Sequence, residues 1–547
     1  MPDAIAPPEG DKEKAKPARE IPFASMVKGI KEKLASIQEK KKMGADLLFM
    51  TTYMASLAIA NATRPEIFSF AANRHEYISA KYIGKVDTFV KKWNYSYSEA
   101  LSIVAERTEN DILRSMLNRY ANSIDSGVPD EDFLSNELAT VRSVYRNQLE
   151  QGMSMLQKWG DAYVAMLLSG TVIAVIIMIS VVIYAPSDIQ STFNMSYGII
   201  LAISVFGITL MYTTVPDDPK SHGLVARMSK EQETIRAMER IIVPLTLGVV
   251  ILLALLGVAA SMIFILAGIL MAPMGIIGFI DDLNITQRDN DFSVFIRSFG
   301  AIMGGQGTTA VYALGSIDRK SLPALEPLVN SVYSKLNLGL DEKQVWDRFI
   351  GEAGSNLIYK YLNIYRDTVA LGGPPEPIGT VVGSSMLEQT LLREKKDMLS
   401  KGFIVLLIPM HVAMTGLFVA LYQILVVLTD SVASMMTKFQ EAAATSGGQG
   451  SGASMSGVFG GGMNLFTNFP KEAMQTYVSI TLAILTVSNI IAARIVGGGD
   501  RYMYYFYAAI FCTLTGLVLL LAPSVVGLFF SSEALTSIGS GVSGTGV

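Results

Sequence analysis

The sequence predicts an all-α, polytopic membrane protein with about seven transmembrane helices and two duplicated cytoplasmic helical-bundle domains. Of its 547 residues, 50% are hydrophobic and only 17% are charged, whereas ordinary soluble domains carry about a quarter charged residues. Seven apolar runs are each long enough to span a bilayer, which takes roughly 20 residues. Two long polar stretches, at 46–161 and 281–402, resemble each other.

The first 45 residues form a basic segment without an apolar core, which excludes a cleaved signal peptide. From Met26 to Lys42, an apolar stripe alternates with lysines at helical spacing. This pattern predicts an amphipathic helix, which either lies on anionic headgroups or a partner, or packs on its own domain. We expect this N-terminus to stay in the cytoplasm.

The predicted spans are approximately 162–185, 197–215, 241–259, 262–280, 403–428, 473–493 and 503–523. The third and fourth come from one apolar stretch about twice the length that a single span needs. Small residues from Gly257 to Ser261 would allow a tight turn between them. Whether 241–280 forms one span or two is left open by the sequence.

The distribution of Lys and Arg predicts the orientation of the spans. All but two of the 44 basic residues, Lys438 and Lys471, fall in 1–161, 216–240, 281–402 and 494–502. Because cytoplasmic loops are enriched in Lys and Arg, these four stretches are predicted to be cytoplasmic. The Gly/Ser-rich loop 429–472 and the tail 531–547 are then external.

The stretches 46–161 and 281–402 are named copy one and copy two. Two segments, at 117–120 and 362–365, lie 245 residues apart and share Leu, Asn and Tyr. With small shifts, 49–53 parallels 295–299, and 94–99 parallels 337–342. Three further residues of copy one recur in copy two at the 245-residue offset: Gly127 as Gly372, Pro129 as Pro374 and Met153 as Met398. Collinear matches that both run into a span indicate an internal duplication.

Each copy has the breaks expected of helical hairpins. The segments 94–98 and 337–341 end in a capping residue, Ser98 or Asp341, which is followed by an acid in the first helical turn. The segments 127–129 and 372–375 combine Gly with Pro, which stops a helix. Both copies are therefore predicted to be bundles of short helices.

The duplicated body, each copy feeding a transmembrane helix, resembles the type II secretion system F-domain family of membrane platform proteins. The segment 307–314 resembles the first turn and second helix of that family, and 338–343 resembles its second turn. The additional span pairs, at 241–280 and after residue 472, look more like the archaeal branch of the family. Copy one departs from the family at its first turn, where Asn61 stands in place of the expected Gly, so its first hairpin is expected to be shaped differently.

Motifs of catalysis and cofactor binding are not found in the sequence. The segment 304–309 is rich in Gly but lacks the Lys with which a P-loop contacts phosphates. His75, His222 and His411 have no acidic or cysteine partner at ligand spacing, and Cys512 is the single cysteine. We therefore predict no enzyme activity, no cofactor and no metal. His411, inside the fifth span, is expected to make a helix-packing hydrogen bond rather than to form a proton relay.

The resemblance implies a platform of an archaellum or type IV pilus-like assembly machine. Its implied partners are a cytoplasmic hexameric secretion ATPase, pilin-like or archaellin subunits and membrane lipids, but no nucleic acid; a homodimer is left open. The ATPase would drive filament assembly and, in the archaellum, rotation. Alternatives are the platform of an archaeal type IV pilus or type II-like secretion system and, from another class, a secondary transporter. Repeats of transporters lie mainly within the membrane, whereas this repeat is mostly outside it.

Basic residues close to the spans are the candidate docking surface for the ATPase. Positive charge beside a span also fixes orientation and attracts anionic lipid, which is the competing explanation. The candidates from the loop 216–240 and from the helix before the fifth span are Arg227, Lys230, Arg236, Arg240, Arg393, Lys395 and Lys396.

Overall fold

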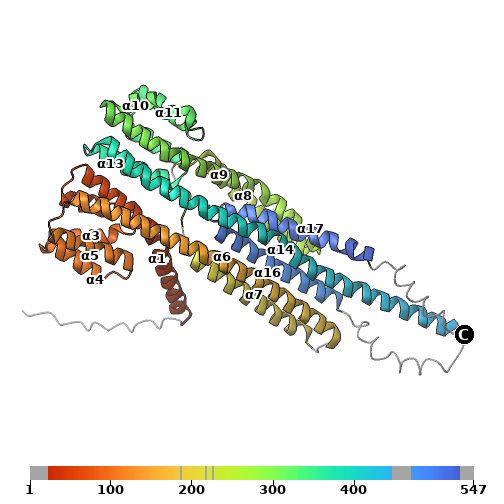
Figure 1. Cartoon of the computed structure of the whole chain (residues 1–547). Helices are drawn as coiled ribbons and strands as arrows, with labels where there is room; N and C mark the ends of the chain where they lie inside the picture. The colour runs from red at the N-terminus through yellow and green to blue at the C-terminus, as the bar shows by residue number, and fades with distance from the viewer. Residues whose placement is uncertain (1–21, 185–187, 216–217, 225–226, 446–469, 530–547) are drawn as a thin grey trace, which may run out of the picture.

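The computed structural model describes residues 22–184, 188–215, 218–224, 227–445 and 470–529, and these are predominantly helical (Figure 1). The linker 446–462 and the tail 531–547 lie outside the described residues. In chain order the helices are α1 (Pro22–Ile59), α2 (Arg64–Ala72), α3 (Ala80–Trp93), α4 (Tyr97–Glu106), α5 (Asp111–Asp125), α6 (Asp130–Tyr184), α7 (Ile189–Thr214), α8 (Lys230–Leu255), α9 (Ala260–Gln306), α10 (Ala310–Ser316), the 3₁₀ turn η1 (Arg319–Ser321), α11 (Glu326–Asn337), α12 (Glu342–Ala353), α13 (Asn356–Ala370), α14 (Pro375–Thr445), α16 (Lys471–Gly497) and α17 (Met503–Phe529).

Seven of the described helices are long and apolar enough to cross a membrane: α6, α7, α8, α9, α14, α16 and α17. The predicted all-α polytopic class is therefore confirmed, and the chain is a multi-pass membrane protein. The apolar stretch 241–280 forms two spans, because α8 ends at Leu255 and α9 begins at Ala260. Gly257 makes the turn between them with φ of +68°, a conformation that glycine adopts without steric cost.

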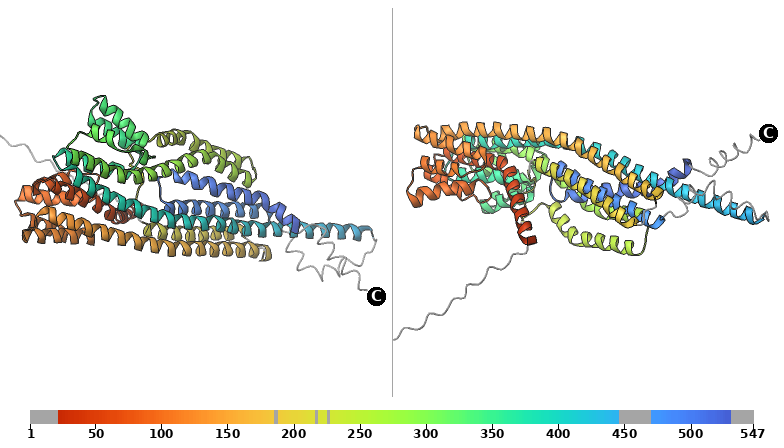
Figure 2. Two further views of the ribbon diagram at one scale, coloured as in Figure 1. Left: turned by 45° about the horizontal axis from the view of Figure 1, so that its top comes forward. Right: turned by 90° about the horizontal axis from the view of Figure 1, so that it is seen from below.

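Three of the spanning helices extend far beyond the membrane. The lengths of α6, α9 and α14 are 55, 47 and 71 residues, well above the roughly 20 that a span needs. Figure 2 shows them running along the molecule from the short helices into the bundle of spans. The domain edges proposed from composition, at 161, 280 and 402, fall inside these helices. They mark a change between polar and apolar surface along a helix, and not the end of a helix.

The two copies have the same succession of helices. A long helix, α1 or α9, is followed by four short ones, and the last long helix, α6 or α14, leads into the membrane (Figure 1). The starts of α4, α5 and α6 each lie 245 residues before those of α12, α13 and α14.

The helix caps of the two copies agree in atomic detail. The side-chain oxygen of Asn110 accepts hydrogen bonds from the second and third amides of α5, and Ser355 does the same for α13. At the other end of these helices, Gly127 and Gly372 both have positive φ and donate to the carbonyl three residues before. Such caps satisfy backbone groups that a helix end leaves without partners. This agreement supports the duplication inferred from sequence.

The first turn of copy one is not shaped differently at its central residue. Asn61 has φ of 57°, and Gly307, at the corresponding place in copy two, has φ of 55°. The expectation drawn from the missing glycine was wrong because Asn tolerates the left-handed region better than most residues.

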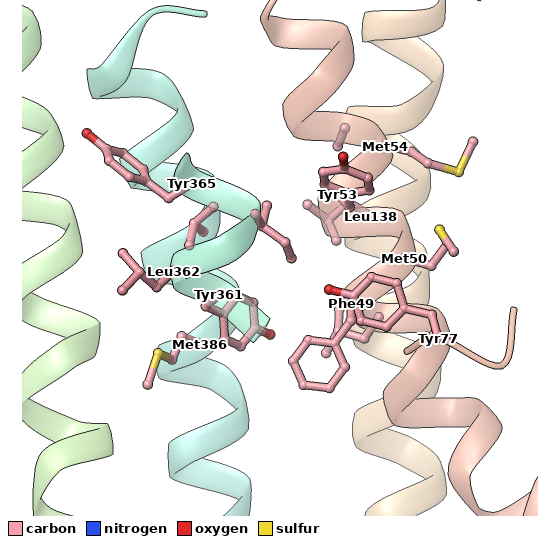
Figure 3. Packing of buried hydrophobic residues seen from close by; sticks show 14 of the residues in the cluster. Phe49, Met50, Tyr53, Met54, Tyr77, Leu138, Tyr361, Leu362, Tyr365 and Met386 are labelled. Carbon is pink, nitrogen blue, oxygen red and sulfur yellow. The ribbon is translucent and has the colours of Figure 1, made fainter. Parts of the chain in front are cut away.

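The two copies pack against each other through α1, α6, α13 and α14. The rings of Phe49 on α1 and Tyr361 on α13 have centroids 5.1 Å apart and face each other in Figure 3. Farther along, the ammonium of Lys395 on α14 lies 2.7 Å from the carboxylate of Glu150 on α6. Glu150 and Lys395 are equivalent positions at the 245-residue offset. A contact between equivalent positions is what a two-fold relation between two elements produces.

The left-handed turn at Asn61 gives a direct test of the fold. Asn61→Ala should lower the free energy of unfolding by about 1 kcal/mol, because a β-carbon without a local hydrogen bond is disfavoured there. Asn61→Gly should leave the stability within a few tenths of a kcal/mol of wild type. Thermal unfolding of the purified protein in nanodiscs measures both, and equal midpoints for the two variants would refute the left-handed assignment.

Candidate coupling site where copy two meets the spans

A buried arginine joins three segments at the boundary between copy two and the spans. Arg393 on α14 is 7% exposed. Its guanidinium lies 2.9 Å from a carboxylate oxygen of Asp289 on α9 and 2.6 Å from one of Asp218, in the segment before α8. The other oxygen of Asp289 accepts from the hydroxyl of Ser355, the cap of α13. Arg393 therefore ties both long helices of copy two to the connection that leads from α7 to α8.

Lys220 makes a second buried bridge beside the first. Its ammonium lies 2.9 Å from Asp282 on α9 and 2.9 Å from Asp397 on α14. Its backbone carbonyl accepts from the amide of Asn356 at 2.8 Å. A buried charge is stable only when it is paired, so α9, α14 and the segment 218–224 are held in one arrangement. We call the residues around Arg393 and Lys220 the ionic junction.

Asp281 fastens α8 to the same place. Its two carboxylate oxygens accept from the hydroxyl of Ser229 at 2.9 Å and from the side-chain amide of Gln232 at 3.0 Å. Asp281 is 2% exposed. The start of α8 is thus bonded to α9 at the end of its span that leads into copy two.

Burial changes the acidities of the junction. It raises the pKa of Asp281 to about 6, although the hydrogen bonds from Gln232 and Ser229 favour the carboxylate. It also raises the pKa of Asp289 to about 6, against the opposing effect of Arg393. At Asp218, burial again opposes ionisation, but the guanidinium of Arg393 outweighs it and lowers the pKa. Arg393 therefore favours the ionised form of both carboxylates, but only at Asp218 does it outweigh burial.

The structure divides the basic residues that the sequence grouped as a docking surface. Arg393 and Lys396 are buried, so the prediction that they face a partner needs correction: their charged groups have almost no surface to offer. Lys395 is exposed but is paired with Glu150.

The other four candidates lie at or near the start of α8. Arg227 faces Asp347 of copy two at 3.6 Å. Lys230, Arg236 and Arg240 lie on α8, which begins at Lys230. The predicted loop 216–240 is therefore helical over its second half. Lys230 and Arg240 are exposed and Arg236 is half-buried.

Sequence reasoning missed the acidic half of the junction. Asp218, Asp281 and Asp289 are partners of residues far away in the chain, and Asp289 and Arg393 are 104 positions apart. The signal that could have found them is their position directly beside the spans, where an ionisable side chain usually has a partner or a function. Pairs of this kind become visible only when α9 and α14 lie side by side.

Inside the spans, a chain of hydrogen bonds joins four helices. The hydroxyl of Tyr163 on α6 donates to Asn489 on α16 at 3.1 Å, and the amide of Asn489 donates to His411 Nδ1 on α14 at 2.8 Å. His411 Nε2 lies 2.8 Å from the hydroxyl of Thr515 on α17. Because Nδ1 accepts, Nε2 carries the proton of the neutral imidazole. The interpretation of His411 as a helix-packing residue is confirmed.

The glycine-rich segment 304–309 is a connection between helices. α9 ends at Gln306, Gly307 has φ of 55°, and α10 begins at Ala310. Within the described ranges, no group of three or more His, Cys, Asp or Glu side chains is placed to hold a metal ion. What the junction can do is mechanical: it connects helices that lie partly inside and partly outside the membrane.

The comparisons with known proteins agree with this architecture. Residues 50–178 match the family described as Type II secretion system (T2SS), protein F, a stretch that runs from α1 through copy one into the span of α6. The spans and this body together define a multi-pass membrane protein whose first body resembles the F-type family.

Two curated relatives are more specific. The chain is 22% identical over 380 residues to "Flagella accessory protein J" of Methanocaldococcus jannaschii, a match that covers 66% of each protein. It is also 22% identical over 373 residues to the protein of the same name from Methanococcus voltae, covering 65% of this chain and 66% of that protein. No solved structure matches the chain. The resemblance to the F-domain family and its archaeal branch is confirmed.

The polar chain inside the spans should contribute measurably to stability. Asn489→Leu leaves Tyr163 and His411 without their partner, and we expect a loss of about 1–2 kcal/mol. The matched control is Ser488→Ala, because that hydroxyl bonds only to Ile484 of its own helix. Unfolding in detergent measures both variants, and equal losses would show that the bonds between helices add nothing.

The raised pKa of Asp281 predicts a pH dependence of stability. An unfolded Asp has a pKa of about 3.9, so between about pH 4 and 6 the folded state holds a proton that the unfolded state has lost. The contribution of Asp281 to stability is therefore full below about pH 4 and is lost as the pH rises through about 6.

Asp281→Asn should remove this component, so the variant loses less stability than wild type between pH 4.5 and 7. The exposed Asp132→Asn on α6 controls for the removal of one acid. Thermal unfolding midpoints in nanodiscs report the difference, and identical pH slopes for wild type and Asp281→Asn would contradict the prediction.

Proposed function

We propose that the chain is the integral membrane platform of an archaellum or type IV pilus-like assembly machine. In this role it binds a cytoplasmic hexameric secretion ATPase and passes the motions of that enzyme to its spans. The spans help pilin-like or archaellin subunits to leave the membrane for the filament, and in an archaellum the same coupling also serves rotation. The chain itself is not the enzyme.

The observation that carries this proposal is the continuity of α6, α9 and α14 from the copies into the membrane. A force applied to a copy reaches the spans through continuous helices. The ionic junction adds a cross-connection between α9, α14 and α8, so these helices move together. The names of the two relatives support the archaellum over the alternatives, a type IV pilus or type II-like platform.

A secondary transporter is less well supported by the spans. The intramembrane polar side chains of His411, Asn489 and Thr515 bond to one another and are almost fully buried. Transporter sites instead leave polar groups available near the midplane.

The proposal includes an orientation in which the N-terminus and both copies are cytoplasmic. Its test uses single cysteines at Ser143 on α6 and at Ser451 in a background without Cys512. An impermeant thiol reagent added to intact cells should label position 451 and not 143. The opposite pattern would reverse the orientation.

Docking of the ATPase is expected to depend in part on the exposed basic residues of α8. Lys230→Glu combined with Arg240→Glu should weaken binding of the purified ATPase to the full-length protein in nanodiscs. The effect should be largest at low salt, because exposed charges act through the association rate and are screened as salt rises.

The matched control for this variant reverses exposed basic residues elsewhere, Arg107→Glu with Lys320→Glu. Equal binding by wild type and both double variants at low salt would exclude α8 from the docking surface. A wild-type chain that binds no secretion ATPase would overturn the proposed function itself.

A further inference from the structure

Two turns of the structure expose large apolar side chains at equivalent positions. The turn between α3 and α4 places Asn94 between Trp93 and Tyr95, which are 65% and 38% exposed. The turn between α11 and α12 places Gly339 between two leucines, Leu338 and Leu340, 79% and 53% exposed. Each residue of the first set lies 245 positions before its counterpart in the second. We call these two turns the apolar tips.

The backbone presents both tips in the same way. Asn94 and Gly339 have φ of 58° and 76°, both in the left-handed region. The residue after each, Tyr95 or Leu340, donates its amide back to the preceding helix. The next residue, Ser96 or Asp341, caps the following helix, so the prediction of Ser98 as the cap of α4 was wrong while that of Asp341 for α12 is confirmed. The apolar side chains therefore flank a fixed turn, which lowers the entropy lost when they are bound.

Folding accounts for these side chains only in part. The rings of Trp93 and Tyr95 each contact the ring of Phe89, with centroids 5.6 and 5.9 Å away, but much of their surface stays exposed. Turns normally carry small or polar residues, and copies one and two bury extensive apolar cores elsewhere. A single exposed apolar residue needs no explanation, but exposure at equivalent places in both copies does. Size and apolarity are shared while the residue types differ, as expected if each tip fills an apolar pocket.

The charge around the two tips differs. Lys91 and Lys92 lie beside the first tip and are exposed, and Lys91 is paired with Asp87 at 3.0 Å. Beside the second tip the charge is mixed: Asp341 caps α12, Glu342 accepts from the indole of Trp346, and Lys343 is exposed. What the tips share is therefore apolar surface and not one sign of charge.

The arrangement of the copies indicates how many such pockets the partner has. The short helices of both copies gather at one end of the molecule, with α3 to α5 and α10 to α11 on opposite sides of the long helices (Figures 1 and 2). The contact between Glu150 and Lys395 relates the copies by an approximate two-fold. A partner that receives both tips must offer the same pocket twice, as a symmetric homo-oligomer does.

We propose that the two apolar tips insert into identical apolar pockets on two subunits of one cytoplasmic homo-oligomer. This inference rests on the proposed function, in which the homo-oligomer is the secretion ATPase. The tips supply the apolar anchors of the interface, and the basic residues of α8 supply attraction at longer range.

The first test measures binding of the purified ATPase to full-length protein in nanodiscs. Trp93→Ala with Tyr95→Ala, and separately Leu338→Ser with Leu340→Ser, should each raise Kd by about tenfold or more. The loss should persist at high salt, because apolar contacts are not screened. Tyr312→Ser with Leu371→Ser removes exposed apolar groups outside the tips and should leave Kd within about twofold.

Each result of this experiment separates the two proposals. If wild type binds and both tip variants bind equally well, with unfolding midpoints like that of wild type, the tips are not anchors and the platform role stands. If wild type binds no ATPase, the platform role and the tip proposal both fail. If the control variant, Tyr312→Ser with Leu371→Ser, weakens binding as much as the tip variants, the effect is not specific to the tips and the proposal is overturned.

The second test addresses the repeated pocket. A photoreactive amino acid placed at Trp93 in one variant and at Leu338 in another should cross-link to the same peptide of the ATPase. Mass spectrometry of the cross-linked peptides identifies it. Two different peptides would refute identical pockets, even if both tips contribute to binding.

Discussion

The pairing of Arg393 is the interaction on which the connection between membrane and copy two depends. A guanidinium stays protonated in a protein. The guanidinium of Arg393 is buried on α14, so it needs carboxylates beside it. Asp289 supplies one of these carboxylates from α9, and Asp218 supplies the other from the segment before α8. Removing one partner of such a buried pair typically costs about 3–5 kcal/mol. One charge that lies outside the apolar spans thus ties two membrane helices, α9 and α14, to the segment 218–224.

Sequence patterns predicted the spans and the order of the turns because both depend on local composition. The split at Gly257 and the stops at Gly127 and Gly372 needed only the chemistry of nearby residues. The junction was not predictable in this way, since an arginine before a span has the same local sequence whether it is buried or exposed. The edges at 161 and 402 lie inside continuous helices for a related reason: polarity changes there while helix propensity does not.

The copies have kept their backbone and changed their side chains. Asn110 and Ser355 differ in chemistry but cap the same two amides, and Asn61 and Gly307 share one dihedral region. Turn geometry is thus the constraint that both copies obey, and it leaves neighbouring residues free to diverge. Copy two alone contributes to the ionic junction through Ser355, so the two bodies are alike in shape and unequal in their attachment to the membrane.

The ionic character of the junction has a consequence for temperature. Hydration of charged groups becomes less favourable on warming, so the desolvation cost of burying ion pairs falls, while the stabilisation from apolar burial levels off. The attachment of copy two, which relies on Arg393 and Lys220, therefore weakens less with heat than the apolar contact between Phe49 and Tyr361. The interface between the two bodies combines both kinds of contact, the ring contact of Phe49 with Tyr361 and the ion pair of Glu150 with Lys395, so on warming its ionic part would be retained better than its apolar part.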